Sequence, residues 1–275
     1  MEDSKILRND LEKAIMEDDV ERLKKIIEEG HSSRLTEIAC GYMSWAVYQC
    51  SVNCFEYLCG AYEQLTNSSR TQVTWHRTGS PFFRIVKECN WAAIRIAEKH
   101  GDLMNYLVDE PTESQESTPL LIAIQNDYEE VAKWLIKEPE KKPDIEKRNA
   151  QGESPIYLAA LKGQAEIIKE MLEIYSCSPE RREILFAKEN LYGKGHSIFY
   201  PASQSRKAAI LDVLMEEKSA SLFLRKELQH SEFQQFVLGS CLSGSEKILK
   251  AMLEVDQNLP IGRFRDEKGA TSLMR

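Results

Sequence analysis

Internal repetition constrains this chain more than any other feature of its sequence. The stretch Ser117–Ile136 begins with a Ser-Thr-Pro turn, continues as a short apolar helix, breaks at Asp127 and resumes as a second, amphipathic helix. The stretch Ser154–Leu172 repeats this order, and its break at Gly163 comes 36 residues after the first. A repeat of this kind is typical of stacked helical units that bury a core only against their neighbours. The sequence therefore predicts an all-α solenoid of helix-turn-helix repeats with long connecting loops.

Equivalent breaks recur along the chain. Each is followed, four to five and eight to nine residues later, by apolar residues that share one face of a second helix. Arg22 and Glu98 depart from this pattern. We expect Arg22 to lie on the outer polar side of the first repeat, and Glu98 to weaken the third. The breaks fall at Asp18, Cys50, Cys89, Asp127, Gly163, Ser205 and Gly244, with spacings of 32, 39, 38, 36, 42 and 39 residues.

The segment Gly152–Ala160, followed by Gly163, resembles the ankyrin repeat, whose pattern is Gly-x-Thr-Pro-Leu-His-x-Ala-Ala and then a break. The ankyrin period is about 33 residues, so most repeats here carry extra loop residues. An irregular helical solenoid of another family is the alternative, but the Ser/Thr-Pro turns favour ankyrin. The usual histidine is absent, and its position is taken by Phe83, Leu121, Tyr157 and Phe199.

The resemblance implies a single array over residues 1–275. The segment Arg265–Arg275 matches the start of a further repeat and stops before a helix. We therefore expect the N-terminal part of a longer protein, with a terminal half-repeat that packs as a lid as the alternative. Loops are expected at Gln64–Thr78, Leu103–Ser117, Lys137–Asp144, Ser176–Leu191 and Glu216–Ser231. The expected repeats cover residues 5–31, 41–62, 78–101, 116–138, 149–175, 190–217 and 232–256, with a partial repeat at 265–275.

Composition and charge narrow the class of partner. The net charge of −8 disfavours nucleic acid, which binds basic surfaces. The sequence has no apolar run of about 18 residues, so we expect no membrane insertion within this chain. The N-terminus lacks the basic start and apolar core of a signal peptide. Seven cysteines, several of them at apolar helix positions, fit reduced thiols. These features predict a protein of the cytoplasm or nucleus.

No group of residues predicts catalysis. Cys50, Cys54 and Cys59 lie close in sequence, but no further pair with zinc spacing accompanies them. Gly193–Ser197 resembles part of a phosphate-binding loop but lacks its first glycine. We therefore predict no catalytic, metal or cofactor-binding residues and no enzyme activity. The histidines are scattered over different repeats, which a solenoid keeps apart: His31, His76, His100, His196 and His230.

The ankyrin resemblance also implies where a partner binds. In that family the first helices line a concave groove, with finger loops at its edge. Trp, Tyr and Arg are favoured at binding hot spots, and we expect a partner-binding stripe of Trp45, Tyr48, Leu158, Leu161 and Tyr200. The alternative is that loops cover these residues and that they belong to the core. All expected groove positions are Trp45, Tyr48, Gln49, Arg84, Lys87, Glu88, Ile122, Gln125, Asn126, Leu158, Leu161, Lys162, Tyr200, Ser203 and Gln204.

Three functions agree with this pattern. The leading prediction is a non-catalytic scaffold that binds another protein of unknown identity. The second is the cytosolic N-terminal array of a transient-receptor-potential-type ion channel, which long irregular repeats resemble. The third is the target-recognition part of a pathogen effector or an enzyme whose catalytic domain lies outside this chain. Residues beyond Arg275 would distinguish these functions.

Overall fold

The computed structural model describes residues 2–28, 35–68, 81–100, 117–137, 143–174, 197–217, 220–229, 233–259 and 263. It divides into two compact units, Met1–Pro143 and Asp144–Arg275. The first contains α1 (Glu2–Met16), α2 (Val20–Glu28), α3 (Leu35–Tyr48), α4 (Val52–Ser68), α5 (Pro81–Lys87), α6 (Trp91–Lys99), α8 (Pro119–Gln125) and α9 (Glu129–Lys137). The second contains α10 (Pro155–Lys162), α11 (Ala165–Ile174), α13 (Phe199–Gln204), α14 (Ala208–Met215), α15 (Ala220–Leu228), α16 (Phe233–Ser243) and α17 (Glu246–Val255). No strand occurs within these ranges, and the all-α repeat fold expected from the sequence is confirmed.

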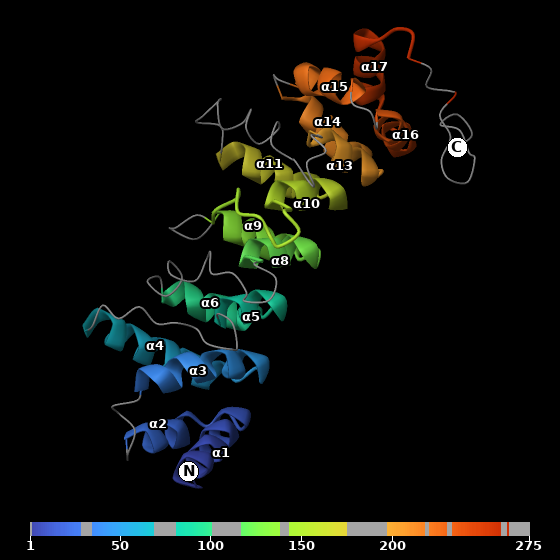
Figure 1. The fold of residues 1–275 in the computed structure, drawn as a ribbon. Coiled ribbons are helices and arrows are strands. Elements are labelled where there is room, and N and C mark those ends of the chain that lie inside the picture. The colour runs from blue at the N-terminus through green and yellow to red at the C-terminus, as the bar shows by residue number, and fades with distance from the viewer. Residues whose placement is uncertain are drawn as a thin grey trace. The chain divides into compact units, whose positions relative to one another are not determined.

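The helices form antiparallel pairs that stack in two layers within each unit (Figure 1). In the first unit α1, α3, α5 and α8 pack in succession, and α2, α4 and α6 do the same beside them. In the second unit α10, α13 and α16 form one layer, and α11, α14 and α17 the other. We call the members of the α1 and α10 layers first helices, and the members of the other layers, together with α9 beside α8, second helices.

The core lies between the layers and between neighbouring pairs. The expected apolar face of a second helix is clearest in α11, where the residues at the predicted positions are all buried. Spacings of one, three and four residues place them on one side of the helix, where the neighbouring α10 and α14 cover them. The buried residues of α11 are Ile167, Ile168, Met171 and Leu172.

Each first helix ends at a residue in the left-handed conformation. In the first pair the amide of Asp18 donates to the carbonyl of Ile15 at 3.0 Å, and the amide of Asp19 donates to that of Ala14 at 2.9 Å. This is the Schellman arrangement, in which a positive φ turns the chain and satisfies the last carbonyls of the helix. The residues with positive φ at these breaks are Asp18, Cys50, Cys89, Asp127, Gly163, Arg206 and Gly244.

One predicted break was wrong by one position. The chain turns at Arg206, whose φ is 56°, and not at Ser205. Ser205 keeps a helical backbone with φ −64°, and its hydroxyl donates to the carbonyl of Ala202 at 2.7 Å. That hydrogen bond keeps Ser205 on the end of α13, so the turn follows one residue later.

The residue after the break caps the second helix. Asp19, Asn90 and Ser245 each accept a hydrogen bond from the backbone amide three residues later. A side-chain oxygen at this position satisfies one of the free amides at the start of a helix. The same residue types that favour turns therefore also start α2, α6 and α17.

The Ser/Thr-Pro turns start the first helices. Thr118 Oγ1 accepts from the amide of Leu121 at 3.3 Å, and Ser154 Oγ accepts from the amide of Tyr157 at 3.2 Å. The proline that follows each occupies the start of the helix. Backbone N–H groups there have no acceptor within the helix, so proline, which lacks an N–H, costs no hydrogen bond. These turns therefore fix where α8 and α10 begin.

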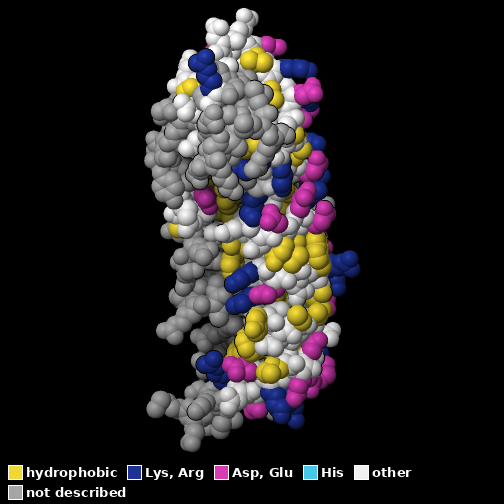
Figure 2. Space-filling model, turned by 90° about the vertical axis from the view of Figure 1, so that its right-hand side faces the viewer, with side chains coloured by type: hydrophobic (Ala, Val, Ile, Leu, Met, Phe, Trp, Pro, Cys, Tyr) yellow, Lys and Arg dark blue, Asp and Glu magenta, His cyan; other side chains and the backbone are white. Residues whose placement is uncertain are grey.

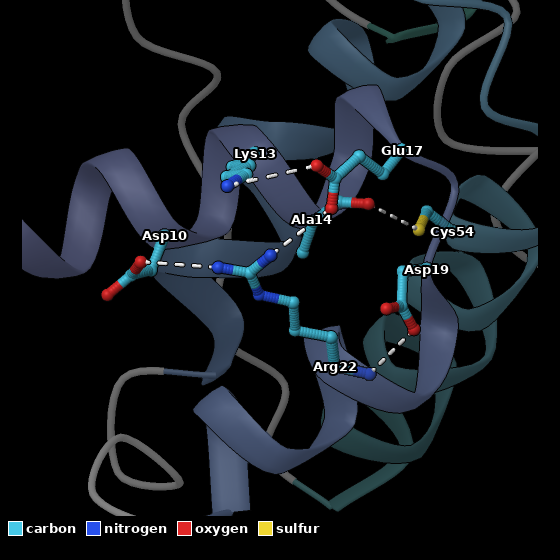
Figure 3. A network of polar contacts seen from close by, with 7 residues as sticks. All are labelled: Asp10, Lys13, Ala14, Glu17, Asp19, Arg22 and Cys54. Atoms are coloured by element: carbon cyan, nitrogen blue, oxygen red, sulfur yellow. Dashed lines mark hydrogen bonds and ion pairs between the residues drawn. The ribbon is translucent and has the colours of Figure 1, made fainter.

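Arg22 joins the two helices of the first pair (Figure 3). Its guanidinium lies 3.5 Å from a carboxylate oxygen of Asp10 and 3.1 Å from one of Glu17 on α1 and its turn. Behind this network Cys54 Sγ of α4 contacts the carbonyl of Ala14 at 3.8 Å. The Arg22 side chain keeps 34% of its accessible surface, in agreement with the expected polar outer side of the first repeat.

Two expectations about single segments were wrong. Residues 216–231 were expected to be a loop, but Ala220–Leu228 form α15, which packs against α16 and α17. Similarly, α4 extends into the expected loop as far as Ser68. In α15 the buried residues Ala220, Leu224 and Glu227 recur at intervals of four and three, so they share one helical face. The Glu227 carboxylate accepts a hydrogen bond from the backbone amide of Ser197, just before α13.

The expected weakening by Glu98 also needs correction. Glu98 Oε1 accepts a hydrogen bond from Nε1 of Trp134 at 2.5 Å, which links α6 to α9. The carboxylate thus satisfies the buried end of a tryptophan from the next pair. The expected partial repeat at 265–275 and the histidines at 31, 76, 196 and 230 lie outside the described residues.

Candidate functional site

The last turn of every first helix except α16 presents an exposed position two residues before the left-handed residue. In the first unit this position is held by Met16, Tyr48, Lys87 and Gln125, all of which are exposed. In the second unit Leu161 and Gln204 are exposed at the same position. Met16 is 62% exposed and was missing from the sequence-based set, although its distance from Asp18 equals that of Tyr48 from Cys50. That spacing was the signal that could have found it.

Trp45 and Tyr48 form an aromatic pair at the end of α3. Their ring centroids lie 5.6 Å apart with an interplanar angle of 29°, a stacked geometry. Tyr48 keeps 53% of its accessible surface, while Trp45 is half-buried. Trp45 therefore supports the Tyr48 ring from the protein side and leaves the tyrosine open to a partner.

Arg84 and Lys87 continue this surface on α5, which packs against α3. The guanidinium carbon of Arg84 lies 5.4 Å from the centroid of the Tyr48 ring, within the range of a cation–π contact. Arg84 also faces the exposed Glu88 at 3.6 Å. Lys87 is exposed, and its Nζ lies 6.0 Å from the centroid of the Phe83 ring. The structure thus brings four predicted residues, Trp45, Tyr48, Arg84 and Lys87, onto adjacent helices.

The α8 end of this surface is polar. Gln125 and Asn126 are exposed, and Asn126 Nδ2 donates to the carbonyl of Ile122 at 3.1 Å. Ile122 itself keeps only 5% of its accessible surface. Gln49, at the α3 turn, is half-buried. The neutral amides of Gln125 and Asn126, and not Ile122, are therefore available to a partner here.

The expected residues of the second unit differ in exposure. Leu161 is 37% exposed, whereas Leu158 is 5% exposed and Ser203 is buried. The carbonyl of Lys162 accepts from Lys207 Nζ at 2.8 Å. Tyr200 donates its hydroxyl hydrogen to Gln235 Oε1 on α16 at 2.8 Å. Leu158 and Ser203 thus serve packing, and Tyr200 is engaged with a neighbouring first helix.

Figure 2 looks onto the side of Figure 1 on which the first helices lie. Hydrophobic side chains gather there in separate patches, with charged side chains between and beside them. Exposed large hydrophobic side chains of the first helices include Met16, Tyr48 and Leu161, and the ion pairs of Lys133 with Glu129 and Glu130 lie on the second helix α9. The first-helix side is therefore the candidate site in each unit.

Cys54 and Cys59 of the first unit are poorly suited to chemistry. Burial raises the pKa of Cys54 to about 12, and the nearby Asp18 carboxylate adds to this shift. Burial also raises the pKa of Cys59, with Glu63 as a smaller cause. A nucleophilic or metal-binding cysteine needs a lowered pKa. Within the described ranges no three His, Cys, Asp or Glu side chains come together in a way that could hold a metal ion.

Comparison with known proteins agrees with this arrangement. Residues 43–149 match the family model described as ankyrin repeats in three copies, a range that begins within α3 and ends ahead of α10. The resemblance drawn from the Ser/Thr-Pro turns is thereby confirmed. No curated protein matches the chain. In the described part of the sequence, none of the helices is both long enough and apolar enough to cross a bilayer.

Proposed function

We propose that this chain, which carries ankyrin repeats at residues 43–149, is a non-catalytic scaffold that binds another protein through the exposed side of its first helices. Ankyrin repeats generally mediate protein–protein interaction. In this proposal the chain acts in the cytoplasm, supplies a rigid surface, and leaves any chemistry to the partner or to a protein joined to it.

The observation that carries the proposal is the exposed Tyr48 ring stacked on Trp45. A tyrosine in a packed helix usually buries its ring, because the ring contributes a large apolar area. Here the ring is held in place at low cost in entropy, since both Trp45 and Arg84 contact it. Rigid, exposed tyrosines flanked by tryptophan and arginine have the composition of binding hot spots.

Three further positions, of which Lys87 and Gln125 were expected from the sequence and Met16 was not, extend the proposed surface in the first unit. Met16, Lys87 and Gln125 occupy the Tyr48 position on the neighbouring first helices, so they form a row with the same orientation. Leu161 and Gln204 form the corresponding row in the second unit. Ile122 and Leu158 do not belong to this surface, because both are buried. Their replacement would change the free energy of unfolding and would not report on binding.

Affinity capture with matched variants tests this proposal. The immobilised 275-residue chain is exposed to extract from the cells that produce it, and bound proteins are identified by mass spectrometry. The test variant is Tyr48→Ala, and the control is Trp91→Ala, which removes an exposed aromatic side chain from the second helix α6. Circular dichroism of both variants checks that helix content is unchanged.

We expect a specific partner that Tyr48→Ala loses and Trp91→Ala retains. Removal of a central hot-spot side chain typically weakens binding by 2 kcal/mol or more, or roughly thirtyfold. A partner that binds both variants equally, or that only Trp91→Ala loses, would contradict binding through the first helices.

A further inference from the structure

We infer that the partner segment bound at α3 and α5 is acidic, with a carboxylate that binds Arg84 and Lys87 beside the Tyr48 ring. This inference rests on the proposed function, because it concerns the same first-helix surface. It adds the chemistry of the bound segment, which the exposed aromatic ring alone does not specify.

The helices of this part of the surface carry basic side chains, although the chain as a whole is acidic and acids follow in the turns at Glu88 and Asp127. The net charge of the chain is −8. By contrast, residues 42–48 of α3 together with all of α5 and α8 contain two bases, Arg84 and Lys87, and no acid. The first acid after them is Glu88, in the turn that follows α5. A basic spot on an acidic protein attracts acidic segments and repels copies of its own acidic surface.

Arg84 has unused capacity to bind a carboxylate. Its contact with Glu88 is 3.6 Å, which is longer than a hydrogen bond, and Glu88 is exposed enough to move away. Its Nε is buried, so the terminal nitrogens of this half-buried side chain are the ones that a carboxylate can reach. Guanidinium groups bind carboxylates through two parallel hydrogen bonds, which the weak contact with Glu88 does not provide.

Lys87 lies one turn further along the same helix. It is exposed, and no ion pair of Lys87 occurs among the residues that the structure describes. Positions three residues apart face the same side of a helix, so Arg84 and Lys87 can act on one acidic segment. Neighbouring positions on α8 carry the neutral Gln125 and Asn126, which do not oppose a carboxylate.

The aromatic pair defines the second feature of the segment. The Trp45 indole supports Tyr48 through its stacked ring. The open Tyr48 ring favours a planar or apolar side chain that packs on it. We therefore expect the bound segment to place an aromatic or large apolar residue within one or two positions of an aspartate or glutamate.

Peptide selection tests this inference without knowledge of the natural partner. The full 275-residue chain is used to select binders from a random linear peptide library displayed on phage, and affinities of synthetic copies are measured by fluorescence polarisation. The same peptides are then tested on Tyr48→Ala, on the double variant Arg84→Gln/Lys87→Gln, and on Lys87→Glu. Arg95→Gln/Lys99→Gln removes the same charges from the second helix of the same pair and is the control.

The expected binders are acidic, contain a neighbouring aromatic or large apolar residue, and bind more weakly as salt is raised. Arg84→Gln/Lys87→Gln should lower their affinity about tenfold or more, and the control variant less than about threefold. Lys87→Glu should also lower the affinity for these peptides. Because Lys87 is exposed, this variant keeps the test valid even if the double variant folds poorly.

The contrary outcomes separate the two proposals. Binders that need Tyr48 but are neutral or basic, or that ignore the Arg84 and Lys87 substitutions, overturn the acidic partner and leave the proposed function standing. Binders unaffected by Tyr48→Ala overturn the proposed function itself. If every selected peptide binds Arg95→Gln/Lys99→Gln less tightly than the wild type, the binding site lies on the second helices. That outcome overturns both the proposed function and the acidic partner.

Discussion

Asp18 turns the first helix pair and also holds the second pair in place through Asn53. Its Oδ2 accepts from the side-chain amide of Asn53 at 2.8 Å and from the Asn53 backbone amide at 3.3 Å. Its Oδ1 accepts from the amide of Cys54 at 2.9 Å. These amides belong to the first turn of α4, so Asp18 caps a helix of the following pair. The left-handed backbone of Asp18, with φ 50°, is thus stabilised by contacts that glycine could not make.

Replacement of Asp18 separates its two roles. Asp18→Ala should destabilise the chain by about 1–2 kcal/mol, because it removes the cap of α4 and keeps a Cβ in the left-handed region. Asp18→Gly also loses the cap but adopts the positive φ freely, so its loss should be smaller by up to about 1 kcal/mol. Urea unfolding followed by circular dichroism measures both. Equal midpoints for wild type and Asp18→Ala would show that the contacts with Asn53 and Cys54 contribute nothing.

Two helical glycines should respond to alanine in opposite directions. A Cβ at Gly239 of α16 would lie 2.7 Å from the carbonyl oxygen of Ser203 in α13, which is a backbone atom. A Cβ at Gly60 of α4 would meet nothing closer than His100 Cε1 at 3.9 Å. Gly60→Ala should therefore stabilise the chain by up to about 1 kcal/mol through helix propensity. Gly239→Ala should destabilise it by about 1–3 kcal/mol through overpacking.

Thermal unfolding of the two variants side by side is the measurement. The same chemical change is made in both, so helix propensity alone predicts shifts of the same sign. A rise in Tm for Gly239→Ala would mean that α13 and α16 can separate without loss, in contradiction to the close approach at Ser203.

The thiols should differ in their rate of modification. Cys50 is exposed, whereas Cys54 and Cys59 are buried and have raised pKa values. At about pH 8 a maleimide reagent should modify Cys50 rapidly and leave Cys54 and Cys59 unmodified until the chain unfolds. Mass spectrometry of peptides after brief labelling, with and without urea, identifies the sites. Early modification of Cys54 in the folded chain would contradict its burial beneath α1.

The raised pKa of Cys54 also predicts a dependence of stability on pH. The ordinary pKa is 9.0 and the value in the folded chain is about 12, so the folded chain holds the thiol proton more tightly. The contribution is complete below pH 9.0 and is lost as pH rises towards about 12, so unfolding should become easier above pH 9.0. Urea midpoints across this range for wild type and Cys54→Ala provide the test. The urea midpoint should fall less steeply with pH in Cys54→Ala than in the wild type. Equal slopes would mean that other groups cause the loss of stability.

Glu227 should be more important than its position in an inserted helix suggests. Its carboxylate is buried, with 1% exposure, and accepts from the amide of Ser197 ahead of α13. Glu227→Ala leaves that amide without its acceptor and should destabilise the second unit by about 1–3 kcal/mol. Glu227→Gln retains an amide oxygen and should lose less. Arg225→Ala, on the exposed side of α15, is the control. If Arg225→Ala lowers the Tm as much as Glu227→Ala does, the hydrogen bond between Glu227 and Ser197 contributes nothing specific.

The repeat register was predictable because it depends on local chemistry. A left-handed residue such as Gly163, a cap such as Ser154 and a proline in the first turn each act within a few residues of the chain. The helix pairs of the described ranges follow these signals even where the break is Cys50 or Cys89, neither of which is a usual left-handed residue. The division of the whole chain into repeats stays a prediction where its boundaries fall outside those ranges.

The part that could not be predicted depends on contacts between pairs. The sequence does not distinguish an exposed apolar residue at a groove position, such as Tyr48, from a buried one, such as Ile122 or Leu158. In the sequence Glu98 interrupts the apolar face of its helix. Its role as a hydrogen-bond acceptor could not be predicted, because the donor, Trp134, belongs to another helix pair. Helix α15 was missed because its buried face is short and includes the charged Glu227.

The sequence by itself determined that this chain forms paired helices, matched to ankyrin repeats over residues 43–149, because turns, caps and the 3.6-residue apolar face are encoded within single repeats. Only the tertiary structure decided which side chains are available for binding. Exposure depends on how the next pair packs against the first, so the combination of Tyr48 with Trp45 and Arg84 exists only when α5 lies against α3. Short-range sequence determines the elements, and the packing of neighbouring elements determines the surface.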